Sequence, residues 1–247
     1  MSKAIVILSG GMDSQTLLYS IKDKEQSICA ISFNYNQKQV QEIECARWNC
    51  NHLGIEHKIV DISNIGKSLL QGNALTSSNV NLPEGHYNEE NMSLTVVPAR
   101  NLIMLSISIA HAISIKYDNV YIGVHGGDHH IYYDCRPSFI FAMNQVAAVC
   151  DKKAIQIKTP FLNMTKGQIA ALGKELNVPY EHSWTCYRGG EKACGRCGSD
   201  IERILAFHEI GMRDPVEYDE GWDEVLKHAL LIDATKKEND ERIKTNK

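Results

Sequence analysis

The fold of this chain is decided by the stretch Ser9-Gly10-Gly11-Met12-Asp13-Ser14. An apolar run rich in β-branched residues, residues 4–8, precedes it and is typical of a buried strand. Residues 15–21 follow it and bring the apolar side chains at 17, 18 and 21 onto one face of a helix. A strand, a Ser/Gly turn and a helix N-terminus together form an anion site, because glycines let the backbone approach a phosphate and unpaired N–H groups point at it. The stretch therefore predicts a phosphate-binding loop.

The side chains of this loop refine the prediction. The hydroxyls of Ser9 and Ser14 can donate further hydrogen bonds to a phosphate, whereas Asp13 is unexpected beside a polyanion. Asp13 fits as a helix cap or as a handle for Mg²⁺ between carboxylate and phosphate. The sequence has neither G-x-x-x-x-G-K-[ST] nor a G-x-G-x-x-G that opens a helix, which excludes the P-loop of kinases and the dinucleotide fingerprint. An ordinary Gly-Gly turn is disfavoured, because the whole motif and both flanking elements agree.

Composition narrows the class of protein. A length of 247 residues suffices for one α/β domain with a small appendage, and 43% apolar and 23% charged residues are ordinary for a globular protein. No run approaches the length of a membrane span, and the N-terminus has no signal-peptide pattern. The net charge of −4 gives no global attraction to nucleic acid. We expect a cytoplasmic protein that binds neither membrane nor nucleic acid, with its eight cysteines reduced.

Strand and helix patterns alternate along the chain, which predicts an α/β fold with a doubly wound parallel sheet. A capping box of Thr165 and Gln168 starts a helix that runs to Leu176, and Gly54 ends an earlier helix. Residues 63–95 are polar and are expected to form a long functional loop, such as a lid or a substrate loop. Ligands bind such sheets beyond the carboxyl ends of the strands, where the Ser/Gly loop lies. The other expected elements are strands at 27–33, 57–62, 120–124 and 155–157 and helices at 39–53, 99–116, 136–150 and 199–209.

Three cysteines near residue 190 have the spacing of a metal site. Cys186, Cys194 and Cys197 form a C-x₇-C-x₂-C pattern, and its C-x₂-C pair is a common zinc knuckle. Structural zinc takes four ligands, and Asp200 follows Cys197 at the same three-residue step. The competing fourth ligands are His182 and, more weakly, His208. Three unligated thiols, or an iron–sulfur cluster held by three thiolates, are the alternatives to zinc.

The S-G-G-x-D-S loop resembles that of the N-type PP-loop ATP pyrophosphatases, and along residues 3–215 the chain resembles the 7-cyano-7-deazaguanine synthase family. The further motifs that carry this resemblance are residues 33–42 (F-x-Y-x-Q-[RK]-x-x-x-E), 97–101 (V-P-x-R-N), 123–139 (G-V-x-x-x-D-x-x-x-Y-x-D-C-R-x-x-F), Thr159-Pro160 with Lys166, 185–187 (T-C-Y) and 194–197 (C-G-x-C). One departure is Asp200, where the family usually has a fourth cysteine, so that a hard carboxylate replaces a soft thiolate. Smaller departures lie at Ala99, His130, Ile131 and Tyr133.

The resemblance implies an adenine nucleotide alpha hydrolase-like PP-loop fold with a small C-terminal zinc-binding helical appendage. It also implies a ligase of queuosine biosynthesis that converts 7-carboxy-7-deazaguanine, ammonia and ATP to 7-cyano-7-deazaguanine (preQ0) through an adenylated carboxylate and an amide. The implied cofactors are ATP, Mg²⁺ and Zn²⁺, and the implied assembly is a homodimer. The catalytic candidates are Asp13, Arg100 and Lys166. The ATP-binding candidates are Leu8, Ser9, Gly10, Gly11, Met12, Asp13, Ser14, Gln15 and Thr16. The substrate-binding candidates are Phe33, Tyr35, Gln37, Asp128, Tyr132, Asp134 and Arg136, and the metal ligands are Cys186, Cys194, Cys197 and Asp200.

Two other functions stay open from the residues alone. A tRNA-thiolating PP-loop enzyme would use the three cysteines for a cluster or for sulfur, although the acidic balance argues against a polyanionic substrate. A non-catalytic nucleotide-binding protein is disfavoured by the intact loop together with Arg100 and Lys166. The histidines at 125, 129 and 130 suggest a second metal site, but a substrate loop is the favoured interpretation.

We expect three units along the chain: a nucleotide-binding α/β domain at 1–180, a zinc-binding subdomain at 181–215 and a helical extension at 216–247. Apolar residues from 222 to 230 follow a helical stripe, so the extension is predicted to pack on the body or on a second subunit. Residues 236–247 are polar with mixed charge and are expected to be frayed. Trp48 and Met104 fall on apolar helical faces and are expected in the core.

Overall fold

The computed structural model describes residues 2–70, 72–76, 94–127 and 132–245. In these residues a five-stranded sheet has the order β3-β2-β1-β4-β5, and every pair of neighbouring strands is parallel. The strands are β1 (Lys3–Ile7), β2 (Ser27–Asn34), β3 (Glu56–Asp61), β4 (Asn119–Tyr121) and β5 (Gln156–Lys158). The order runs outward in both directions from β1, which confirms the predicted doubly wound α/β fold.

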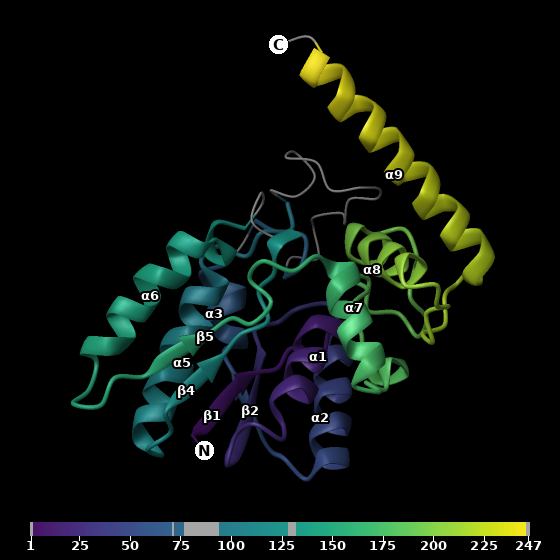
Figure 1. The fold of residues 1–247 in the computed structure, drawn as a ribbon. Coiled ribbons are helices and arrows are strands. Elements are labelled where there is room, and N and C mark those ends of the chain that lie inside the picture. The colour runs from purple at the N-terminus through teal and green to yellow at the C-terminus, as the bar shows by residue number, and fades with distance from the viewer. Residues whose placement is uncertain (1, 71, 77–93, 128–131, 246–247) are drawn as a thin grey trace.

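Helices cover both faces of the sheet, which is why the first strand is apolar and buried at every position after Lys3. Ile5 and Ile7 of β1 belong to one apolar cluster, together with side chains of α5 (Arg100–Ser114) and α6 (Pro137–Val149). Ala4 and Val6 point to the opposite face. There they pack with side chains of α1 (Met12–Ile21), α2 (Gln41–Leu53) and α7 (Lys166–Glu175). Figure 1 shows α5 and α6 on one side of the strands and α1 and α2 on the other.

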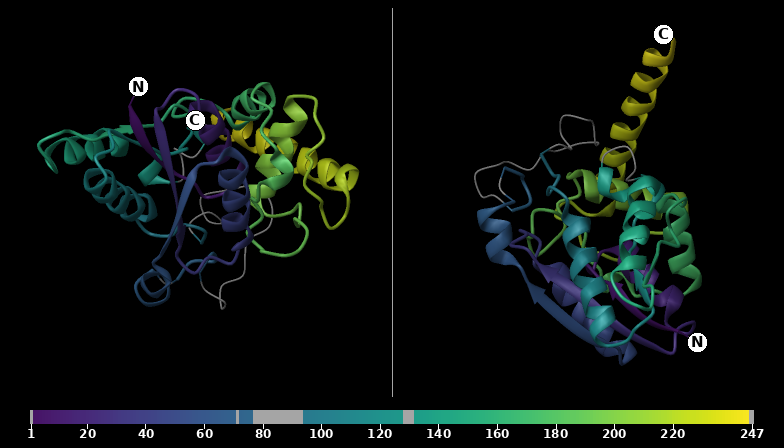
Figure 2. Two further views of the ribbon diagram at one scale, coloured as in Figure 1. Left: turned by 90° about the horizontal axis from the view of Figure 1, so that it is seen from below. Right: turned by 90° about the vertical axis from the view of Figure 1, so that its left-hand side faces the viewer.

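The C-terminal third forms a further layer on the α7 side of the molecule. Helix α8 (Gly198–Glu209) packs on α7, and α9 (Trp222–Thr245) packs on α8 through its first turns. The far half of α9 projects away from the body, as Figure 1 and the right-hand view of Figure 2 show. A buried ion pair secures this layer, because the Arg203 guanidinium donates to both carboxylate oxygens of Asp214 at 2.6 and 2.9 Å. None of the helices that the structure describes is long and apolar enough to cross a membrane.

Local sequence signals explain where several helices begin and end. Gly54 adopts a left-handed conformation (φ 66°) and ends α2 as predicted. Thr165 and Gln168 form the predicted capping box, because the Thr165 side chain accepts from the Gln168 N–H while the Gln168 side chain accepts from the Thr165 N–H. The two remaining short elements next to the site are the 3₁₀ turns η2 (Tyr133–Cys135) and η3 (Tyr180–His182).

Three sequence-based expectations need correction. Residues 63–95 are not loop throughout, since α3 (Ser63–Ser68) opens the segment; residues 77–93 lie outside the described part of the chain. The backbone of the tail that was expected to fray is helical to Thr245, which fits a stretch without glycine or proline. Trp48 is not a core residue, because it is 37% exposed and its ring stacks on that of His182 with a centroid distance of 3.5 Å. Met104 is buried as expected.

Candidate active site

A cavity of about 210 Å³ opens at the carboxyl ends of the central strands. It is lined by the Ser/Gly loop after β1, by Phe33 and Tyr35 at the end of β2, and by residues 122–125 after β4. These residues lie where the strand order reverses, between β1 and β4, which is the crevice in which doubly wound sheets bind ligands. The strand predicted at 120–124 ends at Tyr121, so residues 122–125 leave the sheet and line the cavity.

The loop is held in shape by its own hydrogen bonds. The Ser14 hydroxyl accepts from the Gly10 N–H at 3.2 Å and donates to the Gly11 carbonyl at 3.0 Å. Gly10 has φ 96°, and a Cβ atom placed on it would lie 1.8 Å from the carbonyl oxygen of Glu42. Only glycine fits this position, and the contact fixes the start of α2 against the loop. The Trp184 N–H donates to the Gly10 carbonyl at 3.0 Å, so the C-terminal layer also supports the loop.

Most of the predicted ATP-binding residues line the cavity, but not all of them do. Those that line it are Leu8, Ser9, Gly11, Met12, Asp13 and Ser14. Gln15 is fully buried and donates to the carbonyls of Gly10, at 3.0 Å, and His182, at 2.6 Å. The Thr16 hydroxyl is also buried and lies 2.6 Å from that of Tyr180. Gln15 and Thr16 therefore hold α1 and the loop in place from behind.

A charged group stands beside the loop. The Lys166 ammonium lies 3.3 Å from a carboxylate oxygen of Asp13 and 3.4 Å from one of Glu202. Nε2 of the buried His125 lies 3.8 Å from the same oxygen of Asp13. Because Nδ1 of His125 accepts from the Gly127 N–H at 3.1 Å, the neutral ring carries its proton on Nε2, facing Asp13. The other oxygen of Asp13 is buried and has no hydrogen-bond partner among the described residues.

The opposite wall of the cavity is built by aromatic rings, one arginine and one acid. Arg100 is the first residue of α5, and its guanidinium donates to the Tyr35 hydroxyl at 3.3 Å. Glu42, in the first turn of α2, accepts a hydrogen bond from the Gln37 side chain at 3.0 Å. Burial raises the pKa of the Glu42 carboxyl to about 7, against the lowering effects of Gln37 and Arg100. Gln37 itself is buried and does not line the cavity, because its amide joins Glu42 to the backbone of Phe33 and Tyr35.

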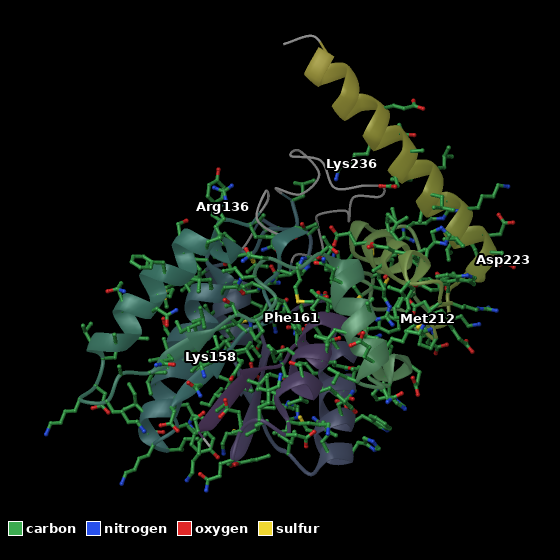
Figure 3. The ribbon with its side chains drawn as sticks, viewed as in Figure 1. Arg136, Lys158, Phe161, Met212, Asp223 and Lys236 are labelled. Atoms are coloured by element: carbon green, nitrogen blue, oxygen red, sulfur yellow. The ribbon has the colours of Figure 1, made fainter. Side chains whose placement is uncertain are left out.

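The other predicted substrate residues have diverse surroundings. Phe33, Tyr35 and Tyr132 line the cavity. The carboxylate of Asp134 accepts from the Asn101 N–H at 2.9 Å, so it caps the start of α5 instead of lining the cavity. Arg136 directly precedes α6, with its guanidinium 3.8 Å from the centre of the Tyr133 ring. In Figure 3 it lies at the upper left, apart from Phe161 near the centre. Asp128, with His129, His130 and Ile131, lies outside the described residues.

Several lining residues were missed by sequence reasoning. Glu42 stands inside a quoted motif, but nothing in its spacing indicates that it faces the cavity. Thr185 and Tyr187 belong to the T-C-Y motif beside the cysteines. Glu202 lies two residues after Asp200, on the helix that follows the metal motif, and no sequence signal connects it with Lys166. Thr185, Tyr187 and Glu202 reach the cavity only because the C-terminal layer folds back over the loop, whereas Glu42 reaches it from the first turn of α2.

The cysteine motif forms a compact, buried cluster. The thiol sulfurs of Cys186, Cys194 and Cys197 and a carboxylate oxygen of Asp200 lie within 4.8 Å of one another. Asp200 Oδ2 accepts from the Gly195 N–H at 2.9 Å, and Asp200 Oδ1 is buried without a partner in the part of the chain that the structure describes. Neither histidine considered as a fourth ligand belongs to the cluster, since His182 stacks on Trp48 and His208 is exposed on α8.

The donor set of this cluster fits a tetrahedral dication. Three sulfurs and one oxygen at such mutual distances can surround an ion with metal–ligand bonds of about 2.0–2.3 Å. Burial raises the pKa of the Asp200 carboxyl to about 7, together with the negative charge of Cys194. A bound cation would offset that cost of burying charge. Gly195, with φ 66°, allows the turn between the two cysteines, and a Cβ atom there would lie 2.3 Å from Val225 of α9.

A parallel sheet with a Ser-Gly-Gly loop at its switch point defines an α/β nucleotide-binding protein of the PP-loop class. The fold alone is shared with NMN synthetase from Francisella tularensis, at a TM-score of 0.51 and 18% identity over 92% of this chain and 84% of that chain. Residues 3–211 match the family described as "Queuosine biosynthesis protein QueC", and the chain belongs to that family.

Close relatives carry one name. The 7-cyano-7-deazaguanine synthase of Marinomonas sp. (strain MWYL1) is 48% identical over 217 residues, which are 88% of this chain and 98% of that protein. The protein of the same name from Hahella chejuensis (strain KCTC 2396) is 47% identical over 88% of this chain and 94% of that protein. Another, from Caldicellulosiruptor saccharolyticus, is 46% identical over 88% of this chain and 96% of that protein. The family match ends before α9, which begins at Trp222.

Proposed function

We propose that this chain is an ATP-dependent carbon–nitrogen ligase that converts 7-carboxy-7-deazaguanine and ammonia to 7-cyano-7-deazaguanine in queuosine biosynthesis. The observation that carries the proposal is the Ser-Gly-Gly loop, with Lys166 beside it, at the switch point of a chain that belongs to the QueC family. The names of the relatives support the same reaction.

The chemistry requires activation of a carboxylate, because its leaving group would otherwise be oxide. Transfer of AMP from ATP to the carboxylate oxygen makes that oxygen a good leaving group and releases pyrophosphate. We assign the pyrophosphate to the N–H groups and hydroxyls of the Ser/Gly loop. Lys166 and Arg100 supply positive charge as negative charge develops on the phosphates and on the substrate carboxylate. Attack by ammonia then gives the amide and AMP. A second transfer of AMP, to the amide oxygen, lets that oxygen leave as part of AMP and gives the nitrile.

The side chains that form the walls of the cavity determine how 7-carboxy-7-deazaguanine and ATP would fit into it. Phe33, Tyr35 and Tyr132 offer aromatic faces for a flat deazaguanine base. We assign Asp134 and Gln37 to positioning, because each holds a neighbouring element through backbone or side-chain hydrogen bonds. Arg136, at the start of α6, stays proposed as a contact for an anionic group that approaches from the outer side.

Two metal ions belong to this proposal. For Mg²⁺, the unpartnered buried oxygen of Asp13 is the protein ligand that fits, since Mg²⁺ is commonly held by one or two carboxylates and by phosphates. Bound there, Mg²⁺ would supply positive charge to the phosphates. For Zn²⁺, we propose Cys186, Cys194, Cys197 and Asp200 as ligands. We propose a structural role for this ion, holding the 181–215 subdomain between the 1–180 domain and the 216–247 extension.

We further propose a homodimer in a reducing, cytoplasmic setting. None of the eight cysteines, all of which lie in the described part of the chain, forms a disulfide bond, which suits a reducing compartment. The outer face of α6 exposes apolar side chains, with Phe141 at 68% and Val149 at 81% exposure, and such a face suits contact with a second subunit.

The first experiment incubates the purified chain with Mg-ATP, ammonium and 7-carboxy-7-deazaguanine and follows the products by mass spectrometry. We expect the nitrile to appear after the amide, with AMP as the nucleotide product. No turnover by a folded, zinc-replete sample would contradict the proposal, and tRNA thiolation would be tested next.

A further inference from the structure

Three acidic side chains line the cavity, and Glu42 differs from the other two in its ion pairing. Asp13 and Glu202 share the ammonium of Lys166. Glu42 forms no ion pair with any residue of the described chain, and the hydrogen bond to its carboxylate comes from the neutral Gln37 amide. The cavity therefore contains one carboxylate that has a fixed position but, within the part of the chain that the structure describes, no counter-charge in contact with it. Such a group is suited to bind a small cation from solution.

The position of Glu42 is fixed from two sides. Its own carbonyl lies against Gly10, so the phosphate-binding loop and this residue cannot shift independently. Its carboxylate is oriented by Gln37, whose side chain also accepts from the Tyr35 N–H at 2.9 Å and donates to the Phe33 carbonyl at 3.0 Å. The end of β2, the loop and the first turn of α2 thus form one rigid unit around the acid. This degree of support is typical of a group whose exact placement matters for chemistry.

We propose that Glu42 binds the incoming ammonium ion and accepts its proton, which releases ammonia beside the activated carboxylate. The inference rests on the proposed function and deepens it, because it names the group that prepares the nitrogen nucleophile. Ammonium has no lone pair, so one proton must leave before nitrogen can attack. A carboxylate within the cavity both attracts the cation in preference to neutral water and accepts the proton.

The step balances as follows. Glu42 takes one proton from ammonium, and the nitrogen lone pair forms a bond to the carbonyl carbon of the adenylate. The tetrahedral intermediate loses a second proton to water, the bond from that carbon to the AMP oxygen breaks, and AMP leaves with the electron pair. Glu42 then returns its proton to solvent. No oxidant or reductant is needed.

The surroundings of Glu42 suit this task. The titratable and charged groups that interact with it are Arg100 of α5, Tyr35 after β2, and Cys45 of α2 itself. Burial raises the pKa of Glu42 to about 7, which lets the carboxyl both accept and release a proton near neutral pH. Arg100 lowers that pKa without neutralising the acid by direct contact.

The test separates the two half-reactions in Glu42→Gln. The first half-reaction is read as exchange of radiolabelled pyrophosphate into ATP, dependent on 7-carboxy-7-deazaguanine and measured without ammonium. The second is read as kcat/KM for ammonium in amide formation, with the ratio of AMP to amide as a measure of lost adenylate. We expect exchange to persist, kcat/KM for ammonium to fall by about 100-fold or more, and AMP to form in excess over amide. Hydroxylamine is largely uncharged at neutral pH and needs no such base, so the variant should still form the hydroxamate.

Two control variants separate a specific role of Glu42 from a general effect of substitution on α2. Glu44→Gln changes an exposed acid two residues away on α2 and should alter neither half-reaction. Glu42→Asp keeps a carboxylate and should restore part of the ammonium dependence. An unchanged kcat/KM for ammonium in Glu42→Gln, or equal loss of both half-reactions, would overturn the inference. Absence of exchange in the unmodified chain would instead overturn the proposed function, and the inference with it.

Discussion

Gly10 is the loop position at which the structure leaves least room. Its φ of 96° and the 1.8 Å separation that a Cβ atom would have from the Glu42 carbonyl oxygen both oppose any side chain. We expect Gly10→Ala to lower the free energy of unfolding by about 3 kcal/mol or more, because backbone strain and a steric clash add. Gly11→Ala is the matched control, since its φ is −75° and a Cβ atom would approach no atom closer than 3.4 Å. Urea denaturation of both variants measures the difference, and equal destabilisation would contradict the argument.

The Lys166 ammonium contacts the loop carboxylate of Asp13, and replacing this lysine tests its role in adenylation. In Lys166→Met the stem remains but the charge that lies 3.3 Å from Asp13 and 3.4 Å from Glu202 is lost. We expect the rate of pyrophosphate exchange to fall by about 100-fold or more, because positive charge would no longer meet the developing negative charge on the phosphates. Lys174→Met, an exposed change on the same helix, should leave exchange unchanged. Exchange that survives in Lys166→Met would remove this lysine from the proposed mechanism.

At the level of single residues, sequence reasoning found the loop but not the supports behind it. The motif identifies Ser9 to Ser14 because the chemistry of phosphate binding requires those residue types in order. Gln15 and Thr16 directly follow this motif in the sequence, yet their hydrogen-bond partners are His182 and Tyr180, far away in the chain. Asp134 was predicted to touch substrate, and only the fold reveals that it caps α5. A contact between distant segments has no local signal, which is why these assignments needed the structure.

The metal knuckle is the element whose stability we expect to depend most on one ligand. Asp200 stands where the family usually has cysteine, and a carboxylate is a harder ligand for zinc than a thiolate. We expect Asp200→Cys to bind Zn²⁺ at least about 10-fold more tightly and Asp200→Ala to bind it more weakly, both measured by competition with a chromophoric chelator. Asp219→Cys, an exposed position near the knuckle, controls for the added thiol. Equal affinities in the unmodified chain and in Asp200→Ala would show that Asp200 is not a ligand.

At the level of elements, periodicity was a good guide where a segment is long and buried. The first three strands and helices α2, α5, α6 and α8 lie within a few residues of their predicted positions. Helix α3 was missed because it spans six residues, too few to display an apolar period, and its Gly66 packs against the Tyr35 carbonyl. The end of β4 was misplaced because Ile122 and Val124, beyond the last residue of the strand, are still buried in the same apolar cluster as Val120 while also lining the cavity.

At the level of the whole molecule, the alternation of strands and helices predicted a parallel doubly wound sheet but could not order its strands. The order β3-β2-β1-β4-β5 puts the loop after β1 next to residues 122–125 after β4, and this juxtaposition creates the cavity. The C-terminal layer then closes it, through Trp184 against Gly10 and Glu202 against Lys166. The cavity therefore depends on the order of the strands, which the sequence does not reveal, although the loop at its centre can be predicted from the sequence.

The pH dependence of folding gives a test of Glu42 that does not involve catalysis. The folded carboxyl has a pKa of about 7, above its ordinary value of 4.5, because burial disfavours the charged form. Between these values the folded chain retains a proton that the unfolded chain has released, so Glu42 removes stability as the pH rises through this window. Glu42→Gln lacks this titration. Relative to the unmodified chain, the variant should therefore gain roughly 1–3 kcal/mol of unfolding free energy on going from about pH 4.5 to above pH 7. Urea denaturation of both proteins across that range measures the difference, with Glu44→Gln as the exposed control. If the difference in unfolding free energy between the two proteins stays constant with pH, folding does not disfavour ionisation of the Glu42 carboxyl. Glu42 would then be a weak proton acceptor near neutral pH.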